Sequence, residues 1–261
     1  MKATLKLFFF LSAMLLFGCD ESDKGAQELQ SRGAVVNKLS LSGDYQRAAD
    51  EAVKLAKDFP GSAKAQFLAA FYLGRKAQMT ESHPFSNETA NEVRKYLSKG
   101  FAIGPDDVET EWGAALVYAG ISAPREAMSI FLKYKDDNEF LTREGRIDTF
   151  SDFAYLIADS GDLPESLEVM DAALAANPGH DSLAQEKVRL LTKFSTIEEV
   201  ELFAKSFESQ FGFRETIQYQ VCSAYKYRQL KEKAIKCFNA LLAVPDLSEE
   251  EREMILSDMK N

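Results

Sequence analysis

The chain has 261 residues, of which 41 are acidic and 31 basic, and its formal net charge at pH 7 is −10. A protein this negative is repelled by nucleic acid and by anionic lipid surfaces, and no basic stripe of the kind that binds a phosphate backbone occurs in it. We therefore predict no nucleic-acid partner, and the length alone allows either one domain or two.

The N-terminal segment has the pattern of a secretory signal. Lys2 and Lys6 give it a positive start, the apolar run 7–17 follows, and Gly18-Cys19 ends it. A charged start, a short apolar run and a small residue before the cleavage point are typical of a signal peptide. The run is too short to cross a bilayer, which takes about 20 apolar residues. We therefore predict that 1–18 is a signal peptide.

The end of this segment, Leu16-Phe17-Gly18-Cys19, resembles a bacterial lipoprotein signal. The resemblance implies that Cys19 becomes the lipidated, palmitate-bearing N-terminus of the mature chain and anchors a periplasm-facing protein to a membrane. Asp20-Glu21 resembles the signal that retains lipoproteins in the inner membrane of enteric-type bacteria, so we favour the inner over the outer membrane. Lipoproteins carry two or three acyl chains, which hold a protein stably where a single chain does not.

Two blocks of the remaining chain share one internal spacing. The first leads from Gly43 to Pro60 and the second from Gly161 to Pro178, so that 17 residues separate glycine and proline in each. Between and after them, apolar residues recur at the i, i+3/i+4, i+7 spacing of amphipathic helices, and strand patterns are almost absent. Because the repeating pattern also has a period of 34 residues, it resembles the tetratricopeptide repeat.

This resemblance implies an all-α fold: an α-solenoid of about six antiparallel helix pairs in a right-handed superhelix. Small residues such as Ala48 and Ser166 would lie where paired helices approach closely. Gly43 and Gly161 would occupy turns at positive φ, and each proline would stop the helix before it. The period is exceeded around 80–87 and 135–138, where we expect loops. We predict helix pairs over 29–62, 63–107, 108–146, 147–180, 181–214 and 215–247, in a repeat domain over 29–261 that follows a lipidated tether over 19–28.

A short acidic helix is predicted over 248–260, after the last pair. Ser248 and Glu251 have the spacing of a capping box, in which each side chain satisfies a free amide of the other residue. Because the two ends of a helical stack expose apolar surface, this helix is expected to cap the C-terminal one.

Two cysteines, Cys222 and Cys237, lie about equally far from the predicted turn near 229–230. On antiparallel helices this places them across from each other, so we predict a disulfide in an oxidising compartment. It would close a loop of about 15 residues and contribute roughly 3 kcal/mol. The alternative is a pair of buried free thiols that pack as small hydrophobic side chains.

In tetratricopeptide proteins the first helix of each pair lines a concave groove. Applied to this chain, the family's groove positions are Phe67, Phe71, Arg75, Trp112, Leu116, Tyr155, Arg189, Lys193, Tyr219 and Tyr227. Aromatic groups with a few cations suit an extended peptide or a helix of a partner. For the two phenylalanines, Trp112 and Leu116, burial between helices is an equal alternative, whereas Arg189 and Lys193 are expected to be exposed.

The sequence contains no serine in a nucleophile-elbow context and no glycine-rich phosphate loop after a strand. Its two histidines, His83 and His180, lie in predicted loops, away from ligand spacing to the cysteines. We therefore predict no enzyme activity, no metal, no cofactor and no small-molecule substrate. The expected function is a scaffold that binds another envelope protein or peptide segment. Alternatives are an obligate subunit of an envelope assembly or export complex (polysaccharide export, pilus or outer-membrane biogenesis), or a glycan-binding accessory protein that stacks sugars on Trp112 and tyrosines.

Overall fold

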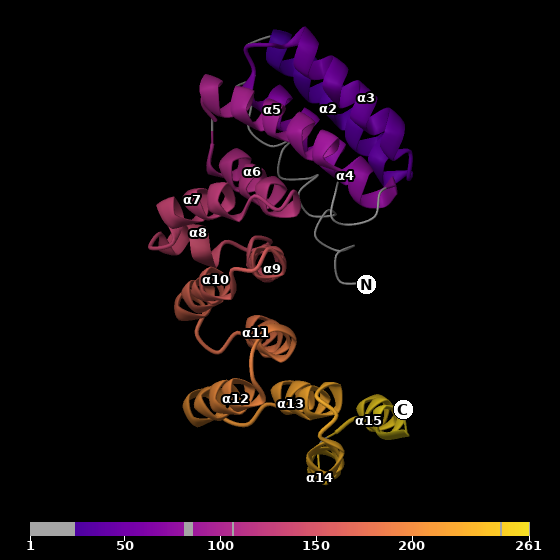
Figure 1. Cartoon of the computed structure of the whole chain (residues 1–261), viewed down its shortest axis with the longest axis vertical. Coiled ribbons are helices and arrows are strands. Elements are labelled where there is room, and N and C mark those ends of the chain that lie inside the picture. The colour runs from indigo at the N-terminus through magenta and orange to yellow at the C-terminus, as the bar shows by residue number, and fades with distance from the viewer. Residues whose placement is uncertain (1–23, 81–85, 106, 246, 261) are drawn as a thin grey trace. The chain divides into compact units, whose positions relative to one another are not determined.

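The computed structural model describes residues 24–80, 86–105, 107–245 and 247–260. All regular elements in these ranges are helices (Figure 1), which confirms the predicted all-α fold. No helix in these ranges carries an apolar stretch long enough to cross a membrane. Outside the described residues lie the predicted signal peptide 1–18, Cys19, Asp20-Glu21 and most of the loop predicted over 80–87.

Each of the six predicted ranges holds a pair of helices. In chain order the pairs are α2 (Lys24–Leu41) with α3 (Tyr45–Asp58), α4 (Ala63–Thr80) with α5 (Asn87–Ile103), α6 (Val108–Gly120) with α7 (Pro124–Tyr134), α9 (Ile147–Asp159) with α10 (Leu163–Ala176), α11 (Asp181–Phe194) with α12 (Ile197–Phe211), and α13 (Glu215–Tyr227) with α14 (Lys231–Leu242). The prediction of six tetratricopeptide-like pairs is confirmed. One boundary is corrected: α2 begins at Lys24, so 24–28, predicted as part of the tether, is helical because no proline interrupts it.

Two turns show how local sequence sets the pairing. Gly43 has a φ of 84° and Gly161 a φ of 95°, both in the left-handed region that was predicted for them. After Gly43, the carboxylate of Asp44 accepts a hydrogen bond of 3.3 Å from the amide of Arg47 and so caps α3. The turn after α2 reverses the chain, so that α3 folds back and packs against α2.

The chain divides into two compact units. One comprises Met1–Lys135 with Asp159–Asp162, and the other comprises Asp136–Ala158 with Leu163–Asn261. The first unit therefore holds α2 to α7, and the second holds α8, most of α9, and α10 to α15.

In the first unit, aromatic side chains from the first helix of a pair pack onto the second helix. The ring of Phe67 on α4 meets that of Phe101 on α5 edge-on at 5.0 Å, and Trp112 on α6 lies 6.4 Å from Phe131 on α7. The guanidinium of Arg75 lies 5.5 Å from the ring centre of Tyr45. These contacts join helices within and between pairs.

The predicted groove is therefore corrected in its N-terminal half. Exposed fractions there are 2% for Phe67, 1% for Phe71, 5% for Arg75, 0% for Trp112 and 3% for Leu116. The reason is physical: a helical face that could line a groove has the same three-to-four-residue spacing as a face that packs on neighbouring helices. Burial, the alternative for the four apolar residues, is what the structure shows, and Arg75 joins them by stacking its guanidinium on Tyr45.

The close approach of α4 and α5 at Gly100 gives a first testable prediction. A Cβ added at Gly100 would lie 2.7 Å from a ring carbon of Phe67. Overpacking costs about 1–3 kcal/mol, while alanine gains about 1 kcal/mol over glycine in a helix. We expect Gly100→Ala to lower the free energy of unfolding by about 1 kcal/mol, measured by denaturant unfolding.

A matched control lies in the facing helix. A Cβ at Gly74 on α4 would meet nothing within 4 Å, so Gly74→Ala should stabilise the protein by about 0.5–1 kcal/mol. In a Phe67→Leu background, which makes room at the contact, the loss from Gly100→Ala should shrink or reverse. A loss unchanged by Phe67→Leu would show that the ring is not its cause.

The period is exceeded at two places. At the first, α4 ends at Thr80 and α5 begins at Asn87, and most of the predicted loop between them lies outside the described residues. At the second, the chain leaves α7 at Tyr134 and turns over 135–137, as predicted, before a short additional helix, α8 (Asn138–Thr142), begins. Asp137 caps it by accepting hydrogen bonds from the amides of Glu139, at 2.9 Å, and Phe140, at 3.2 Å. This capping makes a helical turn favourable in a segment with turn-like composition.

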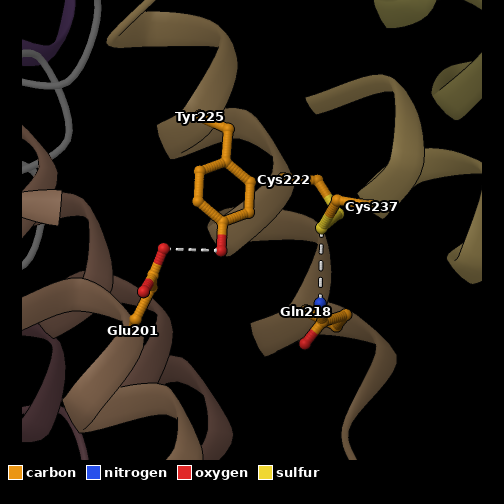
Figure 2. The surroundings of a disulfide bond; sticks show 5 residues. All are labelled: Glu201, Gln218, Cys222, Tyr225 and Cys237. Atoms are coloured by element: carbon orange, nitrogen blue, oxygen red, sulfur yellow. Dashed lines mark hydrogen bonds between the residues drawn. A yellow bond between two sulfur atoms is a disulfide. The ribbon is translucent and has the colours of Figure 1, made fainter. Parts of the chain in front are cut away.

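The second unit ends in a cross-linked helix pair and a cap. Cys222 on α13 and Cys237 on α14 form a disulfide (Figure 2). Their Cα atoms lie 5.4 Å apart. α15 (Glu249–Lys260) follows where the cap was predicted. The predicted capping box is present: the amide of Ser248 donates to Glu251 at 2.8 Å, and the amide of Glu251 donates to the Ser248 hydroxyl at 3.2 Å.

Candidate functional site

The predicted groove residues that reach the surface lie on the first helices of the last three pairs. Tyr155 on α9 and Tyr219 on α13 are half-buried, and Arg189 and Lys193 on α11 are exposed, as predicted. Tyr227, at the end of α13, is 62% exposed. All five belong to the second unit, and we refer to them together as the α9–α11–α13 surface.

Between α9 and α11, the structure brings a cation onto two aromatic rings. The ammonium of Lys193 lies 5.9 Å from the ring centre of Tyr155 and 4.4 Å from that of Phe194. The two rings lie 6.3 Å apart in a tilted arrangement. Since an ammonium over an aromatic face is attracted by the ring quadrupole, Lys193 is held in place at the surface.

Between α11 and α13, arginines provide the links. The Nε of Arg189 donates to the side-chain oxygen of Gln220 at 3.1 Å, and its terminal nitrogen pairs with Glu186. Arg228 donates to the carbonyl of Thr192 at 2.8 Å and also to that of Ser195. Cations at the last carbonyls of a helix stabilise its end, so Arg228 fixes the end of α11 that carries Lys193.

The hydroxyl of Tyr219 is used inside the fold. It donates to the carboxylate of Asp258 on α15, and the ammonium of Lys226 donates to the same carboxylate at 3.0 Å and to the Asp258 carbonyl at 2.7 Å. Burial alone would raise the pKa of Asp258, but the hydrogen bonds from Tyr219 and Lys226 outweigh it and lower that pKa. Tyr219 therefore serves chiefly to hold the capping helix.

A parallel contact ties α12 to the cross-linked pair. The hydroxyl of Tyr225 donates to Glu201 at 2.9 Å (Figure 2), and Lys233 pairs with the same carboxylate at 2.8 Å. The hydrogen bonds from Lys233 and Tyr225 lower the pKa of Glu201. Gln218 donates to the sulfur of Cys237 at 3.3 Å, beside the disulfide. Two tyrosine–carboxylate bonds thus lie on either side of α13.

These two bonds give a prediction for alkaline pH. Burial, followed by the hydrogen bond to a carboxylate, raises the pKa of Tyr219 and of Tyr225 from 10.0 to about 12. A pKa raised on folding contributes stability that is complete below pH 10 and is lost as the pH rises toward 12. We expect the thermal midpoint of the wild type to fall more steeply between pH 10 and 12 than that of the variant with Tyr219→Phe and Tyr225→Phe.

The control is Tyr227→Phe, at a position that is 62% exposed, which should keep the wild-type slope. Lys226 and Lys233 are retained in every variant, so the comparison changes only the two hydroxyls. Equal slopes for the wild type and the double variant would contradict the role given to the two hydroxyls.

This unit also contains a cleft, which lies between α10 and α12. Its volume is about 330 Å³, and its apolar lining includes Leu174 and Pro178 on one side and Phe203, Phe207 and Phe211 on the other. The phenylalanines follow one another at four-residue spacing on α12, with neighbouring rings 6.1 and 4.9 Å apart. No cleft was predicted there, because a stripe of phenylalanines at this spacing is typical of a buried face.

Sequence reasoning also missed Phe194, Gln220 and Arg228, which position the predicted surface residues. None occupies a groove position of the family pattern. A signal for Gln220 was its place 31 residues after Arg189, close to one repeat period. Arg228 could not be placed without the geometry of the turn after α13.

The arrangement offers cations, aromatic rings and amides for binding. In the part of the chain that the structure describes, no three of its His, Cys, Asp and Glu side chains gather as metal ligands would. The surface can donate hydrogen bonds to a carboxylate or a backbone carbonyl and attract its negative charge, and it can stack aromatic or apolar side chains. This is the chemistry of polypeptide recognition.

Six successive antiparallel helix pairs with a capping helix define a helical repeat protein of tetratricopeptide type. The chain matches no protein-family model and no curated protein sequence. Among solved structures it is similar to PilF of Pseudomonas aeruginosa, with 15% identity and a TM-score of 0.53 over 90% of this chain and 100% of PilF. It is also similar to PilW, described as a widely conserved type IV pilus biogenesis factor, with 16% identity and a TM-score of 0.52 over 88% of this chain and 99% of PilW. At such identities the likeness concerns the fold.

Proposed function

We propose that this chain is a non-enzymatic scaffold of the bacterial envelope that binds a partner protein during type IV pilus biogenesis. The observation that carries the proposal is the fold shared with PilW, a type IV pilus biogenesis factor, over 88% of this chain and 99% of PilW. The likeness extends over nearly the whole of both chains. It therefore favours a similar role for the two proteins over the mere presence of one similar domain in each. Fold does not by itself fix function, so the proposal also needs a surface able to bind a protein.

The α9–α11–α13 surface supplies it. Its aromatic and cationic side chains are of the kinds that dominate binding energy in protein interfaces. They are held in position by contacts within the unit, such as the cation–ring contact of Lys193 with Tyr155 at 5.9 Å. A surface positioned before binding loses less conformational entropy when a partner docks. We assign to it a polypeptide segment of the partner, bound as an extended strand or as a helix.

The test is photocrosslinking in cells with a photoreactive amino acid at Tyr155 or, in a separate strain, at Tyr227. The control position is Leu202 on α12, which is 69% exposed and lies outside the predicted groove face. We expect one adduct from the first two positions that is absent from the control, and we expect mass spectrometry to identify a pilus-assembly protein in it. Adducts from Leu202 alone would show that the partner binds another surface. An adduct with a protein of another envelope pathway would refute the pilus role.

Membrane anchoring is the second part of the proposal. We infer that Cys19 carries the lipid, that the body faces the periplasm, and that the inner membrane holds it, because Asp20-Glu21 follows the cysteine. Cells grown with a clickable palmitate analogue should label the wild type and leave Cys19→Ala unlabelled and released from membranes. Recovery of the wild type in the outer-membrane fraction would contradict the inner-membrane location. It would not contradict the lipidation of Cys19.

A permanent subunit of a complex would behave differently from a scaffold that binds reversibly. A reversible scaffold should be stable and well dispersed when produced without other pilus proteins, because its core lies within its own helices. Aggregation or rapid degradation of the protein in a strain lacking the pilus machinery would favour the obligate subunit.

A further inference from the structure

The cleft between α10 and α12 leaves aromatic surface partly open to solvent. Phe203 and Phe211 on α12 and Leu174 on α10 are half-buried, and Phe207 between the two rings is buried. All of them belong to or pack against the apolar core of the second unit. The cleft volume of about 330 Å³ lies at the lower end of the range for ligand sites, about 300–1,000 Å³. We call this feature the α10–α12 cleft.

Small residues keep the α10–α12 cleft open. Ala175 on α10 and Ser206 on α12 belong to its lining and are exposed. At one end of the cleft, Gly179 approaches Phe211 so closely that a Cβ added to it would lie 3.1 Å from a ring carbon. The helices therefore meet at this end. A large side chain at Ala175 or Ser206 would take up the space that remains between them.

The other end of the cleft carries an ion pair. The ammonium of Lys187, on α11, bonds Oδ1 of Asp171 and lies 4.6 Å from the ring centre of Phe203. Lys187 is 9% exposed, whereas the side chain of Asp171 is 62% exposed. Among the described residues that line the cleft, Asp171 alone is charged. Because each carboxylate oxygen accepts hydrogen bonds, Asp171 can receive a further donor from a ligand.

A second carboxylate follows the same row of side chains. Glu199 precedes Phe203 by four residues, so it lies on the face of α12 that carries the phenylalanines, and it is exposed. Lys205, an exposed cation of the same helix, follows Phe203 by two residues and lies roughly 200° around the helix, on the opposite face. At this end of the cleft, Asp171 and Glu199 therefore outweigh the single cation of Lys187.

We propose that the α10–α12 cleft binds a polypeptide segment of another protein that joins bulky apolar side chains to a lysine or arginine at one end. The apolar side chains cover the phenylalanine rings, and the cation meets Asp171 and Glu199. The fold uses the same chemistry internally, because Lys187 already places an ammonium beside the Asp171 carboxylate and over the Phe203 ring. A cation is attracted by both groups.

Charge distinguishes this occupant from the alternatives. An anionic membrane surface would be repelled by Asp171 and Glu199, and a second copy of this chain, with a net charge of −10, would bring further negative charge. An acidic segment suits the α9–α11–α13 surface instead, where Arg189 and Lys193 are exposed. That surface lies on the first helices of the pairs, and the cleft lies between second helices. A scaffold built in this way can hold two partners of opposite charge.

The experiment uses the purified full chain without detergent, since detergent could itself enter the cleft. A lipidated chain is held in phosphatidylcholine nanodiscs. The probe is a fluorescent peptide of about twelve residues, with leucine and phenylalanine at helical spacing and lysines at one end. Fluorescence anisotropy should show binding, and a peptide with glutamates in place of the lysines should bind at least tenfold more weakly. Equal affinity of the two peptides, or no binding up to about 1 mM, would overturn the proposal.

Two matched pairs of variants on α12 locate the binding site. Ser206→Trp should fill the cleft and weaken binding of the basic peptide at least tenfold. Ser209→Trp, at an exposed position outside the lining, should leave it unchanged. Glu199→Gln should weaken binding by about two- to fivefold, the effect of an exposed ion pair, and Glu198→Gln should not, although both remove one exposed charge.

Circular dichroism establishes that each variant keeps its helices, so that weaker binding is not loss of the fold. Equal effects of Ser206→Trp and Ser209→Trp would show that the peptide binds outside the cleft. Equal effects of Glu199→Gln and Glu198→Gln would show that the peptide responds only to net charge. Either result would overturn the proposal.

A photoreactive amino acid at Ser206 identifies the occupant directly. With the basic peptide present, we expect a peptide adduct from Ser206 and none from Ser209. Illumination of the protein alone tests the other occupants: a product of twice the mass would show that a second copy covers the cleft, and a lipid adduct would show that the cleft meets the membrane. Either product would overturn the proposal. These results do not depend on the pilus role, because they are obtained with purified protein and a defined peptide.

Discussion

Trp112→Ala is expected to lower the free energy of unfolding by about 3–5 kcal/mol, the range for removing a large buried aromatic side chain. The indole is 0% exposed and lies 6.4 Å from the ring of Phe131, so its loss opens a cavity between α6 and α7. Small neighbours such as Ala114 and Ala115 have no side chain that could fill the space. Denaturant unfolding, followed by circular dichroism, measures the effect.

Tyr227→Ala is the matched control, because the family pattern assigns both aromatic residues to the same groove. Tyr227 is 62% exposed, and exposed substitutions change stability by about 0.5 kcal/mol or less. The structure thus predicts that Trp112→Ala damages the fold, and the proposed function predicts that Tyr227→Ala damages partner binding instead. A nearly neutral Trp112→Ala that abolishes the photocrosslink from Tyr155 would instead place the indole in the groove.

The pairing of helices could be predicted because its signals are local. Gly43 and Gly161 indicate turns because they adopt a positive φ that other residues avoid. The prolines indicate the ends of helices because proline has no backbone N–H to continue a helix. Each signal acts within a few residues, and Gly43 and Gly161 lie 118 residues apart, which is three repeat periods of 34 plus an excess of 16. The capping box of Ser248 and Glu251 is equally local, and it is present in the structure.

The groove could be predicted only in part. The exposure of a groove residue depends on which side chains of neighbouring helices pack against it. Trp112 and Tyr155 both occupy groove positions of the family pattern, yet Trp112 is buried and Tyr155 is half-buried. The difference arises from partners such as Phe131 and Phe194, whose positions follow from packing. Periodicity identifies a face of a helix, and it does not say whether that face meets solvent.

Arg146 shows the same limit for a charged residue. Arginine is almost never fully buried without partners, yet its side chain here is 1% exposed. It donates to the carbonyl of Phe140 at 2.7 Å and stacks 4.3 Å from that ring centre. These contacts require the short helix α8, which begins where the predicted 135–138 loop ends and was not predicted as a separate element, so the role of Arg146 could not be foreseen.

The disulfide is the second feature with a large expected effect. Replacing Cys222 and Cys237 together with alanine should lower the free energy of unfolding by about 3 kcal/mol, because the bond closes a loop of 15 residues. The cysteines are 0% and 8% exposed, so alanine, which is small and apolar, avoids burying a new polar group. Equilibrium unfolding of the wild type and the double variant, with and without a reducing agent, measures the difference.

The loss should be concentrated at the C-terminal end of the chain. In repeat proteins each unit contacts chiefly its neighbours, so stability is nearly a sum of local terms. α14 and α15 depend on α13 through the disulfide, through Tyr219 and Lys226 on Asp258, and through the apolar cluster that Phe238 and Leu241 form with Ile255. Without the bond, hydrogen exchange should accelerate in these two helices while the amides of α3 to α5 keep their protection. Reducing agent should reproduce this pattern in the wild type and leave the double variant unchanged.

Full thiol labelling of the unreduced, denatured protein would show that the cysteines are free, and burial of two thiols would then be the correct description of the pair.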